Sequence, residues 1–106
     1  MNNTLLSSGL SEQTIEKLRQ VFSNNAKIAT VILYGSRAKG NFHEGSDIDL
    51  TIKGDALDFS DLLTLETAID DLLLPYKIDL SLYDNITNIN LIKHIERVGI
   101  VFYQKN

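Results

Sequence analysis

The run from Ile28 to Tyr34, IATVILY, is the feature that most constrains the fold. It is almost wholly apolar and rich in β-branched residues, a pattern typical of a strand buried within a sheet. The chain of 106 residues fits one small domain, residues 1–106. A domain of this size buries roughly 65% of the surface that its unfolded chain would expose, so its core is modest. We therefore predict a small sheet with this strand at its centre.

Helical periodicity predicts three amphipathic helices around that strand. Ser11 can act as the N-cap of the first helix, with Leu10 and Ile15 at the hydrophobic-staple positions. Pro75, the only proline, marks the exit from the second helix, and Gly99 suits the C′ position of the third. The three predicted helices span residues 11–24, 59–74 and 88–98.

Two further segments alternate apolar and polar residues, as strands with one buried face do. They cover residues 47–52 and 77–83, with a turn at residues 53–55 and a last short strand at residues 100–103. The order helix, strand, strand, helix, strand, helix, strand predicts an α/β (α+β) fold. We expect a small mixed β-sheet with the helices packed on one face.

Composition narrows the classes of function. The net charge of −4 argues against broad nucleic-acid binding, which requires clustered lysine and arginine, so we expect no direct nucleic-acid binding. The absence of cysteine excludes disulfides and thiolate metal sites. No segment resembles a signal peptide or approaches the ~20 apolar residues that span a bilayer. We expect a cytoplasmic protein with no membrane contact.

Three aspartates share the polar sides of the two alternating strands. Alternation places Asp47 and Asp49 on one side of the segment 47–52, and Asp79 on the corresponding side of the segment 77–83. If these strands are neighbours, the three carboxylates converge and repel one another unless a cation lies among them. Oxygen ligands of this kind suit Mg²⁺ or Mn²⁺, and Mg²⁺ commonly binds carboxylates together with substrate phosphates. The acid cluster therefore predicts a phosphate-bearing substrate.

The dipeptide Gly35-Ser36 follows the central strand directly. Gly35 lets the backbone turn sharply and approach a ligand closely. Residues 36–40 can begin a short helix whose free N–H groups face phosphates, and the Ser36 hydroxyl can donate to a phosphate oxygen. Arg37 and Lys39 are the local positive charges available to such a ligand.

Each of these signals has a less specific interpretation when it is taken alone. An Asp-x-Asp pair such as Asp47 and Asp49 is often a solvated strand edge, and a Gly-Ser pair is usually a plain turn. Their combination, with a later aspartate on a strand of matching phase, is much less expected by chance. The two histidines indicate little: His94 reads as a surface or boundary residue of its helix, and His43 lies in a loop.

The combined pattern resembles a known signature. Gly35-Ser36, ten intervening residues and Asp47-x-Asp49 match the GS-x10-DxD motif of the DNA polymerase beta-like nucleotidyltransferase superfamily. YGSRAKG followed by SDIDL is similar to the sequences of its minimal nucleotidyltransferases. The resemblance covers nearly the whole chain, from the first predicted helix to the last predicted strand. The resemblance implies a polymerase beta-like nucleotidyltransferase fold with two divalent ions on Asp47 and Asp49. It also implies that Gly35 and Ser36 hold the triphosphate and that Asp79 is the third carboxylate.

The same resemblance implies a function. Minimal nucleotidyltransferases are antitoxins that transfer AMP from ATP to a tyrosine of a HEPN-domain RNase toxin. This implies a Mg²⁺-dependent protein adenylyltransferase that forms a complex with a HEPN toxin. Two alternatives stay open: an antitoxin that inhibits by binding alone, and nucleotidyl transfer to a small molecule or an RNA end. The net charge of −4 and the expected lack of a second, substrate-binding domain argue against the last.

Overall fold

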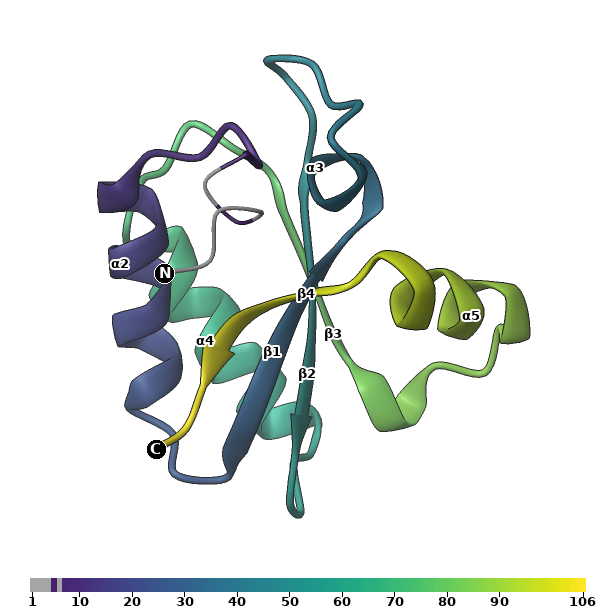
Figure 1. Cartoon of the computed structure of the whole chain (residues 1–106). Coiled ribbons are helices and arrows are strands. Elements are labelled where there is room, and N and C mark those ends of the chain that lie inside the picture. The colour runs from purple at the N-terminus through teal and green to yellow at the C-terminus, as the bar shows by residue number, and fades with distance from the viewer. Residues whose placement is uncertain (1–4, 6) are drawn as a thin grey trace.

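The apolar segment 28–34 lies inside a four-stranded sheet in the computed structural model, which describes residue 5 and residues 7–106 (Figure 1). The strands are β1 (Ile28–Tyr34), β2 (Ile48–Gly54), β3 (Ile78–Leu82) and β4 (Ile100–Gln104). Their order across the sheet is β3-β2-β1-β4. β1 pairs antiparallel with both β2 and β4, whereas β3 pairs parallel with β2. The predicted mixed sheet and the central place of β1 are confirmed.

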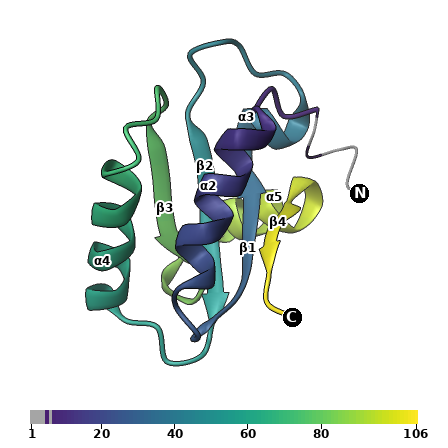
Figure 2. The ribbon, with the colours of Figure 1, turned by 90° about the vertical axis from the view of Figure 1, so that its left-hand side faces the viewer.

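The helices divide between the two faces of this sheet. They are α2 (Glu12–Ser23), α3 (Gly35–Lys39), α4 (Phe59–Asp70) and α5 (Ile89–Val98), with a 3₁₀ turn η1 (Tyr83–Asn85). The two long helices α2 and α4 cover one face, as predicted (Figures 1 and 2). The third predicted helix, α5, instead lies on the opposite side of the sheet, close to α3 (Figure 1). None of the helices in the described residues is long and apolar enough to cross a membrane.

The main core lies between the sheet and the pair α2 and α4. Val31 and Leu33 of β1 are fully buried there and pack with Leu18 and Phe22 of α2. Phe102 of β4 meets Phe22 edge to face, with ring centres 6.4 Å apart. Because side chains alternate along β1, the residues between these point to the other face, where α5 lies.

The end of α5 packs closely against that other face. Ile95 of α5 is only 3% exposed, although it does not belong to the main core. A Cβ on Gly99 would overlap the Ile95 carbonyl and lie 2.7 Å from Ile32 Cγ2. Gly99 has φ −60°, so the left-handed C′ conformation suggested by the sequence is not adopted. This glycine is needed for close contact between helix and strand instead.

The start and end residues of α2 and α4 are better indicated by their capping residues than by the extent of their apolar stripes. The Ser11 hydroxyl accepts a hydrogen bond from the Thr14 N–H, which confirms the predicted N-cap of α2. The second helix begins at a capping box and ends at Asp70, four residues before the predicted end. Leu73 already has a left-handed backbone, φ 54°, as the chain turns toward Pro75 and β3. Proline disfavours the helical conformation of the residue directly before it, which here is Leu74.

Candidate active site

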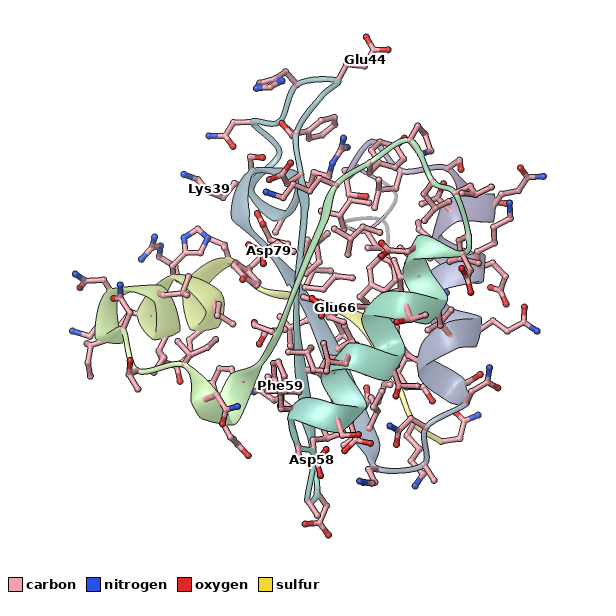
Figure 3. The ribbon with its side chains drawn as sticks, turned by 180° about the vertical axis from the view of Figure 1, so that it is seen from behind. Lys39, Glu44, Asp58, Phe59, Glu66 and Asp79 are labelled. Atoms are coloured by element: carbon pink, nitrogen blue, oxygen red, sulfur yellow. The ribbon has the colours of Figure 1, made fainter. Side chains whose placement is uncertain are left out.

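Parallel pairing of β2 and β3 brings two of the predicted carboxylates side by side. Asp49 of β2 is in register with Asp79 of β3, and Asp47 lies just before β2 begins. Asp49 is half-buried, whereas Asp47 and Asp79 are exposed. In Figure 3, Asp79 lies near α3, while Asp58, Phe59 and Glu66 follow α4. The strand phase that the sequence predicted therefore places three acids at one edge of the polar face.

The protonation behaviour of Asp49 shows that the three acids interact. Burial raises the pKa of Asp49, and the charges of Asp79 and Asp47 raise it further. Lys77 acts in the opposite direction and favours the ionised carboxylate. The sequence analysis missed Lys77 as a neighbour of this cluster. Its position, two residues before Asp79 and so in the same strand phase, was the signal available.

Gly35 fits against Asp49 because it has no side chain. Its backbone is left-handed, φ 76°, a conformation that favours glycine, and a Cβ at this position would overlap Asp49 Oδ2. The turn begins the short helix α3, which ends at Lys39 with Gly40 as its C-cap; the short helix that the sequence predicted at residues 36–40 is present. Ser36 is half-buried in the first turn of α3. Its hydroxyl makes no hydrogen bond within the described part of the chain, so it is available to a ligand.

Arg37 is a correction to the predicted set of nucleotide-binding residues. Its side chain is 2% exposed. The guanidinium donates to three backbone carbonyls of the surrounding loops, those of Ser8, Glu44 and Ser46. All three of its nitrogens are thus used within the protein. The sequence showed a basic residue after Gly-Ser, but a helix of five residues directs successive side chains to different sides, and this one points inward.

Lys39 lies at the exposed end of α3 (Figure 3). Its ammonium group influences His94 of α5, whose pKa it helps to lower. Lys39 is therefore an exposed positive charge close to α5. Its predicted contact with a nucleotide stays a prediction.

A polar network lies beneath the carboxylates. Thr51 of β2 is fully buried, and its Oγ1 accepts a hydrogen bond of 3.0 Å from Ser81 Oγ of β3. Tyr34 pairs with Asp49 across β1 and β2. Burial raises the pKa of the Tyr34 phenol, with Asp79 and Asp49 adding to the shift and a hydrogen bond involving Ser81 opposing it. The sheet face under the acids is therefore polar and satisfied, and it supports Asp49 from both neighbouring strands.

His94 is a second residue that the sequence analysis missed. The Gly35 N–H donates to His94 Nε2 over 3.1 Å, so this amide has a partner within the protein. The imidazole also meets the Tyr34 ring edge to face, with ring centres 6.1 Å apart. The sequence feature that could have indicated the role of His94 is its position next to Ile95, on the inward-facing stripe of an amphipathic helix. His43, by contrast, is exposed in the loop before β2.

The chemistry of these donors suits a hard divalent cation. All three are carboxylates, which Mg²⁺ and Mn²⁺ prefer. Burial raises the pKa of Asp49 and repulsion from Asp79 and Asp47 adds to the shift, and a cation would relieve that repulsion. No three aspartate, glutamate, histidine or cysteine side chains among the described residues stand in an arrangement that could hold a metal as it is. Asp47 and Asp79 are exposed, however, and their side chains are free to turn toward an ion.

Solved structures share this fold. A crystal structure described as a toxin–antitoxin with AMP-PNP is 26% identical over 92% of this chain and 76% of its own, with a TM-score of 0.68. The tri-AMPylated Shewanella oneidensis HEPN toxin in complex with MNT antitoxin gives 18% identity, 91% and 74% coverage, and a TM-score of 0.66. A nucleotidyltransferase from Sulfolobus solfataricus, described as putative, gives 15% identity, 99% and 90% coverage, and a TM-score of 0.59.

No curated protein matches the chain. Residues 16–106 do match the profile of one protein family, described as "Polymerase beta, Nucleotidyltransferase". The match includes the Gly35-Ser36 turn, both aspartates of the Asp47-x-Asp49 motif and Asp79. With most of its length matched and its acids in register on β2 and β3, the chain belongs to the polymerase beta nucleotidyltransferase family.

Proposed function

We propose that this protein transfers AMP from ATP to a tyrosine of a HEPN toxin, and so acts as the antitoxin of that partner. The observation that carries the proposal is the register of Asp49 with Asp79, with Asp47 adjacent and the Gly35 turn packed on Asp49. A phosphate-binding turn beside a carboxylate cluster suits nucleotidyl transfer, and membership of the family supports that class of reaction.

Two related structures support the finer points. The complex that is 26% identical is a toxin–antitoxin with AMP-PNP, an adenine nucleotide, which favours ATP as the donor. The Shewanella oneidensis complex contains a tri-AMPylated HEPN toxin beside its MNT antitoxin, which favours a HEPN protein as the acceptor. Its 18% identity supports the shared fold, so the choice of acceptor for this chain rests on the experiment below.

The reaction is a displacement at the α-phosphorus of ATP. The tyrosine oxygen of the partner forms a bond to the α-phosphorus, the bond from that phosphorus to the bridging oxygen breaks, and pyrophosphate leaves. Ser36 binds a phosphate oxygen through its hydroxyl, and Asp79 either binds a metal or accepts the proton of the attacking hydroxyl. Two Mg²⁺ or Mn²⁺ ions, held by Asp47 and Asp49 with Asp79, would neutralise phosphate charge and lower the pKa of the attacking hydroxyl.

A large acceptor also fits the open shape of the site. Asp47 and Asp79 are exposed, so bulk water reaches the carboxylates in the isolated protein. Exclusion of water strengthens electrostatic interactions at a reacting phosphate and prevents hydrolysis. A partner protein that covers this edge of the sheet would provide that exclusion together with the acceptor hydroxyl. We therefore expect a hetero-oligomer of antitoxin and toxin.

Co-expression with a candidate HEPN partner, followed by intact-mass measurement of that partner, tests the proposal. The wild type should add one or more AMP masses, and the Asp47→Asn, Asp49→Asn variant should add none. A partner that stays unmodified yet is neutralised in cells would establish an antitoxin that acts by binding alone. If no HEPN protein is modified or neutralised, the remaining candidate is transfer to a small molecule or an RNA end, which labelled ATP would detect.

A further inference from the structure

His94 holds the backbone of the residue on which the phosphate-binding turn depends. The Gly35 N–H donates to His94 Nε2 over 3.1 Å, and Gly35 lies against the Asp49 carboxylate. The left-handed backbone of Gly35, φ 76°, is the conformation that directs the chain from β1 into α3. A glycine has more backbone freedom than any other residue, so this turn gains most from an external contact that fixes it.

The position of His94 is itself well defined. Its ring packs edge to face on Tyr34, at an interplanar angle of 80°. The next residue of α5, Ile95, is 3% exposed, and Gly99 brings the end of this helix into close contact with Ile32 of β1. The imidazole is therefore carried by a helix that is fixed to the central strand. Because the accepting imidazole is held in place, its hydrogen bond with the Gly35 N–H restrains Gly35.

The hydrogen bond requires a neutral imidazole. Nε2 accepts the Gly35 proton, so the ring proton must be on Nδ1. Burial lowers the pKa of His94, and the positive charges of Arg97 on α5 and Lys39 on α3 lower it further. The group that faces the ring from β1 is the Tyr34 phenol, whose raised pKa keeps it uncharged at neutral pH. Burial and the charges of Arg97 and Lys39 thus favour the neutral, accepting form.

We propose that His94 is a positioning residue of the transfer reaction, which holds the Gly35 amide and thereby sets the Gly-Ser turn beside Asp49 before ATP binds. The role rests on the proposed function, because it concerns the binding of the ATP phosphates. It needs no contact between the imidazole and the nucleotide. Protonation of His94 removes the acceptor and releases the turn, so the turn is ordered at neutral pH and loosened in acid.

Three variants on α5 test this role. His94→Ala removes the acceptor, His94→Gln supplies a side-chain oxygen that cannot be protonated in this range, and Glu96→Gln is the control at an exposed position of the same helix. Initial rates of AMP transfer to the HEPN partner are measured against ATP concentration between about pH 5.5 and 8. We expect His94→Ala to raise KM for ATP about five- to tenfold, the loss of one hydrogen bond. His94→Gln should recover most of it and abolish the acid limb of the profile.

Amide hydrogen exchange gives a readout that does not require activity. The Gly35 amide should exchange slowly in the wild type and in His94→Gln, and quickly in His94→Ala, with the nitrogen shifts of labelled His94 indicating a proton on Nδ1. If Gly35 exchange and KM for ATP are unchanged in His94→Ala, the proposal is overturned. If the wild type transfers no AMP, the proposed function fails, while the exchange of Gly35 still decides the role of His94.

Discussion

We predict that Arg37 stabilises the fold and does not bind the nucleotide. Replacement by methionine keeps much of the side-chain length but removes every donor. Its Nη1 donates to the Ser8 carbonyl over 2.9 Å, Nε to the Ser46 carbonyl over 3.1 Å and Nη2 to the Glu44 carbonyl over 3.3 Å. The variant Arg37→Met therefore leaves three backbone acceptors without their donor, two of them in the loop before β2.

The magnitude follows from these contacts. Each hydrogen bond from a charged group contributes about 1.5–3 kcal/mol. The guanidinium carbon also lies 4.9 Å from the ring centre of Phe42 and 5.0 Å from that of Tyr76, so the charge is stabilised by both rings. Methionine recovers part of the packing and water reaches some carbonyls, so we expect a net loss of about 3–5 kcal/mol from the carbonyls left without a donor. That is a large part of the ~5–15 kcal/mol typical of a domain.

Urea unfolding followed by circular dichroism gives the free energy of unfolding, and calorimetry gives the affinity for ATP. Lys39→Met is the matched control, because Lys39 is on the same helix and is exposed. We expect the control to change the free energy of unfolding by less than about 0.5 kcal/mol. Arg37→Lys should be intermediate, since lysine lacks the planar fork that reaches several carbonyls at once. An Arg37→Met protein of normal stability with lost ATP affinity would refute the structural role.

Three further predictions concern the acids and the Gly-Ser turn. In EDTA, Asp49→Asn should raise the melting temperature at pH 7, because folding raises the pKa of Asp49 above its ordinary value of 3.8 and the ionised carboxylate therefore costs stability. The gain in melting temperature should shrink as the pH falls toward that ordinary value. Thermal melts that show the same gain at every pH would contradict this explanation. Calorimetry should show that the wild type binds ATP in Mg²⁺ and binds little in EDTA. The Asp47→Asn, Asp49→Asn variant should stay folded and bind ATP weakly in both. Equal binding of ATP by the wild type with and without metal would exclude the metal-dependent site. Ser36→Ala should weaken ATP binding by ~1–3 kcal/mol, the scale of a hydrogen bond to a charged group, and unchanged affinity would assign the phosphate to backbone N–H groups alone.

Most of the fold follows from short-range pattern. The alternation of residues 47–52 and 77–83 identified both strands of the site and the side of the sheet that carries the acids. The apolar stripe of residues 59–74 was a poorer guide to the end of its helix, because Leu73 and Leu74 continue the stripe after the backbone has turned. The side on which α5 packs was also not predictable, since an amphipathic helix has an apolar stripe whichever face of the sheet it covers.

The candidate site shows a similar division. The register of Asp49 with Asp79, with Asp47 nearby, was predictable because strand phase determines where a side chain points. Arg37 and His94 were interpreted wrongly or passed over, because each depends on a long-range contact that leaves no periodic signal. Arg37 reaches a carbonyl 29 residues away, and His94 reaches an amide 59 residues away. In such positions the residue type shows which bonds are possible, but only the tertiary structure shows which partner is present.

The parallel pairing of β2 and β3 has a consequence for how this protein tolerates insertions and deletions. The segment that joins the two strands, residues 55–77, crosses the face opposite the acids, so changes in its length need not move Asp79. A single residue inserted within β3 between Ile78 and Asp79 would instead reverse the phase of everything after it, and would turn Asp79 toward the hydrophobic core and Leu80 toward solvent. Natural and engineered relatives should therefore vary freely in loop and helix length, whereas β2 and β3 should keep their alternation of side chains without insertions or deletions.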